Sequence, residues 1–257
     1  MSTLPEGSDQ GFVEEAIKVV DAAEERGTVL RIMGATAIRI HCPKFSYLYE
    51  ALQREITDID LVGYEKQKTD VLKLLEDLGY FADRRMRMLH LLGRYTFQNP
   101  NSKRHIDVFF DKLEMCHTID FRGRLEIDCP TISLSDLFLE KTQIVEINEK
   151  DIRDVMVLLR EHEIAREGKE AIDCGYITAL LSKDWGFYYT VTTNLGKMQA
   201  FLPEYEALSA EDRSDISAKI DSLSKAIEKS EKSLMWKIRA KTGTRKQWYR
   251  SVEDTGL

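Results

Sequence analysis

Three aspartates in two short apolar runs are the residues whose types and spacing could do chemistry. Asp58 and Asp60 lie two residues apart in the run TDIDL, and Asp107 lies in the run HIDVF. Residues two apart on an extended chain share one face, so both carboxylates of the first run would point the same way. Hard divalent cations prefer carboxylate oxygens. The pattern therefore predicts a metal site of Asp58, Asp60 and Asp107, suited to phosphoryl or nucleotidyl transfer.

A glycine turn precedes the first pair of acids. Residues 29–33 form a short, partly β-branched apolar run that predicts a buried strand, and Gly34 follows it directly. Residues 35–40 are expected to begin a helix. Backbone N–H groups at such a turn could contact phosphates.

In this order, the runs GAT at 34–36, TDIDL at 57–61 and IDV at 106–108 resemble the signature of the DNA polymerase β nucleotidyltransferase superfamily. The runs LFLEK, ending at Lys141, and KDIRD at 150–154 resemble elements of the branch that contains the AbiEii-type toxins. The resemblance extends over roughly residues 29–159. Two features depart from the family pattern: Ala35, which offers no side-chain donor, stands where the family usually has glycine or serine, and the interval from Gly34 to Asp58 is long.

The resemblance implies a magnesium-dependent nucleotidyltransferase that moves an NMP from an NTP such as ATP to an acceptor hydroxyl and releases pyrophosphate. Two Mg²⁺ ions, or Mn²⁺ in their place, would be held by the three aspartates. The nucleotide-binding residues would be Gly34, Ala35, Thr36, Lys141, Asp151 and Asp154. The acceptor could be RNA such as tRNA, a protein or a small molecule, and an antitoxin partner is implied. The alternative is a catalytically silent nucleotide- or RNA-binding protein on the same scaffold.

The predicted elements that position these residues change character along the chain. The apolar spacing predicts helices at 12–26 and 67–78, a strand at 59–62, a hairpin of 94–98 with 104–110, and an extended pair of 118–121 with 124–127. Helices are predicted at 133–144, 149–162, 171–181 and 216–238. The expected fold is α/β (α+β): a small mixed sheet in residues 1–130, followed by a helical domain in residues 131–257 with a basic C-terminal tail.

Charge and composition limit the classes of partner. The chain has 257 residues and a net charge of −7, which argues against indiscriminate coating of nucleic acid. No apolar run is long enough to span a bilayer, and the first residues are not signal-like, so we expect a cytoplasmic protein with no membrane partner. The four cysteines are scattered and indicate neither a zinc site nor disulfides.

Further residues have both a functional and an ordinary interpretation. A basic segment could reach phosphates or be a solvated helix face; its members are Arg84, Arg85, Arg87, His90 and Arg94. Arg54 could pair with Asp58 or Asp60, or lie on the surface. The aromatic run 185–189 could stack a base or belong to the core. The basic tail 237–250 could hold RNA, or could be a solvated terminus.

Overall fold

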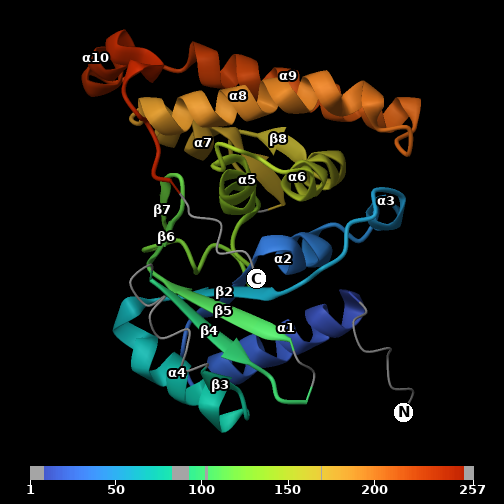
Figure 1. Cartoon of the computed structure of the whole chain (residues 1–257), viewed down its shortest axis with the longest axis vertical. Coiled ribbons are helices and arrows are strands. Elements are labelled where there is room, and N and C mark those ends of the chain that lie inside the picture. The colour runs from blue at the N-terminus through green and yellow to red at the C-terminus, as the bar shows by residue number, and fades with distance from the viewer. Residues whose placement is uncertain (1–8, 83–92, 102–103, 169, 252–257) are drawn as a thin grey trace. The chain divides into compact units, whose positions relative to one another are not determined.

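The computed structural model describes residues 9–82, 93–101, 104–168 and 170–251 (Figure 1). The chain divides into two compact units. Unit 1 comprises Met1–Pro43, Glu55–Glu114 and Ile119–Ser133, and unit 2 comprises Lys44–Arg54, Met115–Thr118 and Leu134–Leu257. The chain passes from unit 1 to unit 2 for the last time between Ser133 and Leu134, close to the predicted domain boundary between residues 130 and 131. The two short insertions of unit 2 into the first half of the chain were not predicted.

Unit 1 is built on a five-stranded mixed sheet with the order β1-β2-β5-β4-β3. Its strands are β1 (Leu30–Met33), β2 (Ile59–Gly63), β3 (Phe81–Ala82), β4 (Arg94–Gln98) and β5 (His105–Phe110). The β2–β5 pair is parallel and the other pairs are antiparallel. The predicted mixed sheet and the β4–β5 hairpin are therefore confirmed.

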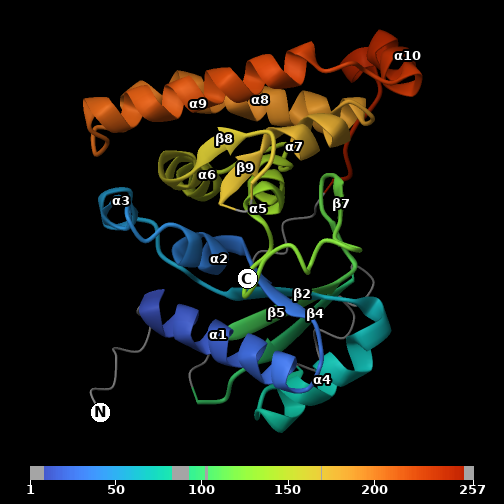
Figure 2. The ribbon, with the colours of Figure 1, turned by 180° about the vertical axis from the view of Figure 1, so that it is seen from behind.

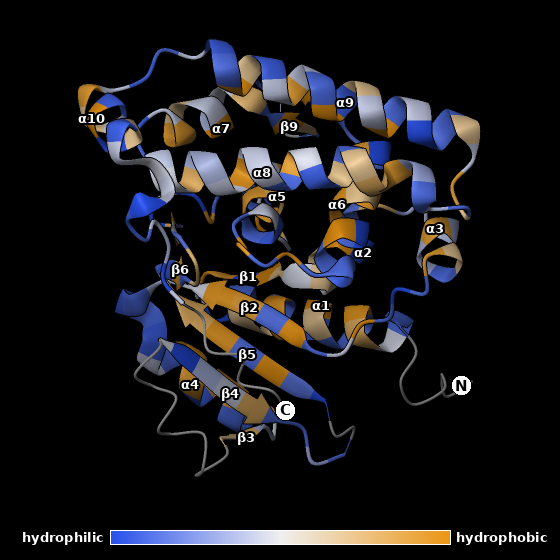
Figure 3. Ribbon diagram, turned by 45° about the horizontal axis from the view of Figure 1, so that its top comes forward, coloured by the Kyte–Doolittle hydropathy of each residue, from blue (hydrophilic) through white to orange (hydrophobic). Residues whose placement is uncertain are grey.

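Two helices, α1 (Asp9–Glu25) and α4 (Lys68–Asp77), cover one face of this sheet (Figures 1 and 2). The buried positions of α1 are Phe12, Ala16, Val19, Val20 and Ala23, a spacing that places them on one helical face. A short 3₁₀ turn, η1 (Glu65–Gln67), precedes α4. Hydrophilic bands interrupt the otherwise hydrophobic strands β2 and β5 (Figure 3), and Asp60 and Asp107 lie in these strands.

The predicted pairing of 118–121 with 124–127 is wrong. The strand β7 (Thr118–Asp120) instead pairs with β6 (Lys112–Glu114) in a separate two-stranded sheet. Residues after Phe121 form turns, because Gly123 adopts a φ of +71° and the amide of Arg124 donates to the carbonyl of Phe121.

Unit 2 is mainly helical, as predicted. It holds α3 (Tyr47–Ala51), α5 (Leu134–Thr142), α6 (Glu149–Glu161), α7 (Cys174–Leu181), α8 (Trp185–Phe201), η3 (Leu202–Glu204), α9 (Ala210–Lys229), α10 (Leu234–Thr242) and η4 (Gly243–Arg245). The long helices α8 and α9 lie side by side (Figures 1 and 2). None of the helices in the described ranges has both the length and the apolar character needed to cross a lipid bilayer.

Two predicted helices of unit 2 differ from the structure. The first three residues of the predicted helix 171–181 form β9 (Ala171–Asp173), which pairs in parallel with β8 (Glu163–Ala165). The predicted helix 216–238 is two helices, because Ser230 is extended at the end of α9 and Ser233 caps the start of α10. Serine side chains accept hydrogen bonds from helix N-termini, so they favour a break where apolar periodicity alone predicts continuity.

The basic tail is packed against α8 and is not a solvated terminus. The Trp248 indole donates to the Thr190 hydroxyl at 3.1 Å, and its ring meets the Tyr189 ring edge-on at 5.1 Å between centroids. The backbone amide of Arg250 donates to the carbonyl of Cys116. Within α8, Trp185 and Phe187 are buried, so the interpretation as core is confirmed for these two residues, while Tyr188 and Tyr189 are half-buried.

Candidate metal and nucleotide site

The three predicted aspartates converge at one place in unit 1. Asp60 and Asp107 are partners in the parallel β2–β5 register, and Asp58 lies directly before β2. One carboxylate oxygen from each of the three lies within 4.8 Å of the others. Asp58 and Asp60 are half-buried, while Asp107 is 1% exposed. In the part of the chain that the structure describes, no other group of three His, Cys, Asp or Glu side chains is arranged to hold a metal ion.

Two side chains of β4 hold Asp107 in place. Thr96 lies opposite it in the antiparallel register, and the Thr96 hydroxyl donates to Asp107 Oδ1 at 2.5 Å. Arg94, two residues earlier on the same face, donates to Asp107 Oδ2. Burial lowers the pKa of Arg94, but the hydrogen bond and charge of Asp107, with the charges of Asp60 and Asp58, raise this pKa overall. Arg94 therefore stays charged and offsets part of the negative charge of the triad.

Gly34 is required beside Asp60 for two separate reasons. Its φ of +70° lies in the left-handed region, which residues with a Cβ rarely adopt. A Cβ at this position would also lie 2.5 Å from Asp60 Oδ2. Gly34 begins α2 (Gly34–His41), so the first turn of this helix lies directly against the acidic site.

The other two residues of the glycine turn are buried. Ala35 is 7% exposed and Thr36 is 1% exposed. The Thr36 hydroxyl donates to the backbone carbonyl of Asp58 at 3.3 Å. Thr36 therefore ties the start of α2 to the start of β2, and in this structure its hydroxyl is engaged within the chain.

The triad fits a hard divalent cation. Its ligands are all carboxylate oxygens, the donor type that Mg²⁺ prefers, and they come from two adjacent strands and the residue directly before one of them. Opposite ligands of an octahedral Mg²⁺ lie about 4.2 Å apart, at roughly 2.1 Å from the ion. A small inward movement of the carboxylates would therefore seat one ion, and its charge would relieve their mutual repulsion.

The remaining predicted nucleotide-binding residues lie together in unit 2. Lys141 of α5 places its Nζ 3.3 Å from Asp151 Oδ1 and 3.3 Å from Asp154 Oδ2, both on α6. Burial alone would lower the pKa of Lys141, but Asp154, Glu140 and Asp151 raise it above its usual range. The ammonium is therefore held charged in a buried position.

Arg54 joins this cluster, and the interpretation of it as a surface residue is wrong. Arg54 is 7% exposed. Its Nε and one terminal nitrogen donate to the two oxygens of Asp154 at 2.8 and 2.9 Å. The buried carboxylate of Asp154 needs two cations around it. No local pattern in the sequence indicated this pairing across 100 residues.

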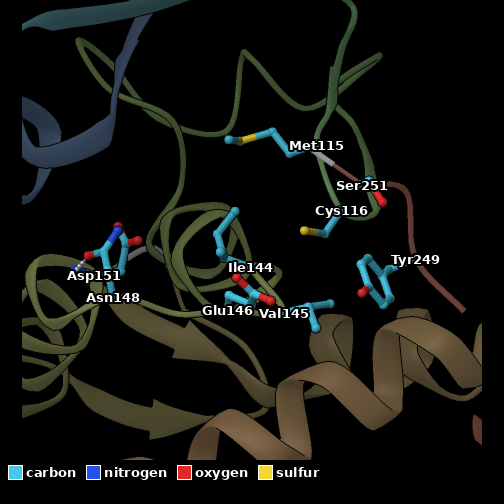
Figure 4. Close-up of a pocket in the computed structure, with 9 residues that line it drawn as sticks. All are labelled: Met115, Cys116, Ile144, Val145, Glu146, Asn148, Asp151, Tyr249 and Ser251. Atoms are coloured by element: carbon cyan, nitrogen blue, oxygen red, sulfur yellow. Dashed lines mark hydrogen bonds between the residues drawn. The ribbon is translucent and has the colours of Figure 1, made fainter. Parts of the chain in front are cut away.

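Asp151 also faces a cavity of about 380 Å³ in unit 2 (Figure 4). The cavity is lined by Met115, Cys116, Ile144, Val145, Glu146, Asn148, Asp151, Tyr249 and Ser251. Its lining contains two carboxylates and no lysine or arginine. This cavity is therefore poorly suited to phosphate groups.

Of the predicted basic segment, Arg84, Arg85, Arg87 and His90 lie outside the described residues. Arg94, its last member, is neither a solvated helix residue nor free to bind phosphate in this structure, because it is a strand residue paired with Asp107. The sequence gives only a weak signal that Arg94 would pair with Asp107. Only the register of the hairpin places Arg94 on the same face as Asp107.

No protein-family model matches the chain, and no curated protein matches it. Two solved structures that match cover most of the chain. The solution structure of the antibiotic-resistance factor ANT(2'')-Ia is 14% identical with a TM-score of 0.37, covering 86% of this chain and 96% of that chain. The crystal structure of an antigenic nucleotidyltransferase-like protein from Paracoccidioides brasiliensis is 14% identical with a TM-score of 0.43, covering 88% and 96%. Both TM-scores are low, so the function proposed below rests on the residues of this chain.

Proposed function

We propose that this protein is a nucleotidyltransferase of the polymerase β type, which transfers an NMP from an NTP to an acceptor hydroxyl with release of pyrophosphate. The observation that carries the proposal is the convergence of Asp58, Asp60 and Asp107 beside the glycine start of α2. A site with three carboxylates within reach of one ion and a helix N-terminus beside it can bind both a divalent cation and a phosphate chain.

Each residue has a distinct role in this proposal. Asp58 and Asp60 would hold magnesium, and Asp107 would complete the ligand set in an orientation fixed by Thr96 and Arg94. When bound, the metal supplies neutralisation of the triphosphate and activation of the attacking hydroxyl. The missing side chain of Gly34 lets phosphates approach the backbone of α2, whose first N–H groups would donate to them.

In unit 2, Lys141 would offset triphosphate charge. Asp151 and Asp154 would keep its ammonium oriented and protonated. Arg54 would act as a positioning residue, because it holds Asp154 by two hydrogen bonds. These roles rest on the proposed chemistry and on the geometry within unit 2 alone.

Three classes of acceptor for the NMP are compatible with this function. RNA such as tRNA was predicted from the family resemblance and the basic tail, with a protein or a small molecule as alternatives. Within the tail, Trp236 packs on Tyr188 and Trp248 packs on Tyr189, so both indoles are engaged inside the chain. Base stacking on these two rings therefore does not support an RNA acceptor. Membership of the AbiEii-type branch, an antitoxin partner and a cytoplasmic location stay predictions.

The direct test is transfer of label from α-labelled NTPs, with Mg²⁺ or Mn²⁺, into RNA, protein or small molecules. We expect label in one acceptor fraction, and at least a hundredfold loss in Asp60→Asn with the thermal melting temperature nearly unchanged. Asp120→Asn is the matched control, because Asp120 is an exposed acid paired with Arg122 outside the triad. Near-normal transfer by Asp60→Asn would refute the metal assignment.

A catalytically silent nucleotide-binding protein is the competing function, favoured by Ala35, which offers no side-chain donor where the family usually has glycine or serine. The two are distinguished by the rise in melting temperature with NTP. Stabilisation that requires Mg²⁺ and is lost in Asp60→Asn supports the enzyme. Stabilisation in EDTA equal to that in Mg²⁺, with no transfer to any acceptor, supports the silent protein.

A further inference from the structure

The large hydrophobic side chains with the greatest exposure among the described residues all lie on one short helix. Leu234 is 73% exposed, Met235 is 70% exposed and Ile238 is 52% exposed, and all three belong to α10. Single exposed apolar residues are ordinary on a protein surface. Three of them on one nine-residue helix form a patch, and such patches mark contact surfaces.

The opposite side of α10 is already packed. The Trp236 ring meets the Tyr188 ring of α8 edge-on at 5.0 Å, and the Arg239 guanidinium lies 4.7 Å from the centre of the Trp185 ring. Helical geometry places residues 234 and 238 on one side of α10 and residue 236 on the opposite side, with residues 235 and 239 between them. The helix is therefore docked through its aromatic and arginine side and leaves its aliphatic side exposed.

Cations flank this aliphatic side. Lys237 and Lys241 are exposed on α10 one turn apart, and Lys246 is exposed just beyond it. Residues 234–251 contain no acidic residue, although the whole chain has a net charge of −7. We call Leu234, Met235, Lys237, Ile238 and Lys241 the α10 patch. Its occupant must accept aliphatic groups and carry negative charge.

The composition of the α10 patch distinguishes between classes of occupant. RNA binding uses exposed aromatic rings, whereas the patch exposes aliphatic chains. A symmetric contact with a second copy would bring the same lysines face to face. Cores of protein interfaces are enriched in aromatic residues and arginine and depleted in lysine. Exposed aliphatic side chains bordered by lysines are the pattern of helices that lie at a charged lipid surface.

We propose that the α10 patch binds the surface of an anionic phospholipid membrane, with Leu234, Met235 and Ile238 inserted at the headgroup boundary and Lys237 and Lys241 paired with lipid phosphates. The patch would lie on the membrane rather than span it. This departs from the sequence-based expectation of no membrane partner, which considered only spanning segments. The proposal is independent of nucleotide transfer.

The test is flotation of the full chain with vesicles, in the absence of nucleotide. We expect the protein to float with equimolar phosphatidylglycerol and phosphatidylcholine, much less with phosphatidylcholine alone, and less as salt is raised. Leu234→Ser/Ile238→Ser and Lys237→Gln/Lys241→Gln should each weaken partitioning by at least about tenfold. Phe201→Ser is the matched control, because Phe201 is 43% exposed at the end of α8 and outside the patch. It should bind like the unchanged chain.

Because the substituted side chains are exposed, unchanged melting temperatures should accompany these losses. Absence of flotation by the unchanged chain would overturn the proposal, and so would equal flotation of Leu234→Ser/Ile238→Ser. Light scattering that shows a dimer abolished by the serine substitutions would assign the patch to a second copy instead. RNA binding lost in the lysine variant but kept in the serine variant would assign it to RNA.

Discussion

At the scale of single residues, the candidate site depends on how three carboxylates are tolerated together. Asp107 is buried, yet both of its oxygens have donors, from Thr96 and Arg94. Asp60 lies against a position where only glycine leaves room for its carboxylate. The site is thus built from acids and from the residues that make room for them and offset their charge.

Gly34→Ala should impair nucleotide transfer more than it impairs stability. The left-handed backbone costs roughly 1 to 2 kcal/mol for a residue with a Cβ, and the new Cβ would push the Asp60 carboxylate away. Gly123→Ala is a matched control, since Gly123 has a φ of +71° with nothing within 4 Å of an added Cβ. We expect similar losses of unfolding free energy in urea for both variants, and a large loss of transfer only for Gly34→Ala. Equal activities would contradict the role of Gly34 at Asp60.

Arg94→Gln should make the metal-free protein less stable and the response to metal larger. Removing the guanidinium leaves one oxygen of the buried Asp107 without a charged donor, a cost of about 1 to 3 kcal/mol. The triad also becomes more negative, so Mg²⁺ should raise the melting temperature more than in the unchanged protein. Arg122→Gln, at an exposed pair with Asp120, should show neither change. An unaltered magnesium response in Arg94→Gln would show that Arg94 does not modulate the site.

At the scale of elements, a hydrogen-bonded chain joins the 115–118 segment, α8 and the tail within unit 2. His117 Nε2 lies 2.8 Å from the Thr190 hydroxyl, which also accepts from the Trp248 indole. The His117 ring stacks on Phe187 at 4.8 Å between centroids. This packing holds the basic tail in place within unit 2.

The buried imidazole of His117 predicts that the stability of the protein depends on pH. Burial, with a contribution from Arg250, lowers the pKa of His117 to about 4 from its usual 6.5. Below pH 6.5 the unfolded chain takes up a proton that the folded chain refuses until about pH 4, so stability is lost as the pH falls through this window. The loss due to His117 between pH 7 and pH 5 should be about 2 kcal/mol.

The measurement is urea unfolding of the unchanged chain and of His117→Gln at pH 7 and pH 5. Other groups titrate in both proteins, so the difference between their pH slopes isolates His117. His117→Gln should be less stable at pH 7 because it loses the stacked ring, but it should lose less stability on acidification. Identical slopes would mean that the pKa of His117 is the same in the folded and the unfolded chain.

At the scale of the whole molecule, unit 2 is assembled from three separate stretches of chain. Arg54, in the 44–54 stretch, forms an ion pair with Asp154. In the same stretch, the centre of the Phe45 ring lies 4.2 Å from the guanidinium carbon of Arg160. Tyr47 of the same stretch donates to Asp212. These contacts join residues more than 99 positions apart, so the helical half of the sequence does not contain all of its own core.

A fragment of residues 131–257 should therefore fold poorly. Without Arg54, the buried Asp154 keeps only part of its compensating charge, and breaking a buried pair costs about 3 to 5 kcal/mol. Circular dichroism in urea should show weak cooperativity for the fragment and a sharp transition for the full chain. Adding a peptide of residues 44–54 should stabilise the fragment, while the same peptide with Arg54→Leu should not. A fragment as stable as the intact chain would make the 44–54 stretch dispensable.

The sequence by itself determined the features that depend on neighbours along the chain. Apolar periodicity predicted α1, α4, α5 and α6, and short apolar runs predicted β1, β2, β4 and β5 but not β3. The spacing of Asp58 and Asp60 and the apolar setting of Asp107 predicted one acidic site, because strand alternation is a local property. The position of Gly34 directly after a strand was predicted as well, because a short apolar run followed by glycine is also a local pattern.

Only the tertiary structure decided which distant groups meet. The register of β4 against β5 placed Arg94 and Thr96 on Asp107, and the insertion of residues 44–54 into unit 2 placed Arg54 on Asp154. Packing of Trp236 and Trp248 on α8 decided that the tail is ordered and that α10 turns its aliphatic side outward. These pairings follow from burial and charge compensation between segments far apart in the chain, and no local pattern encodes them.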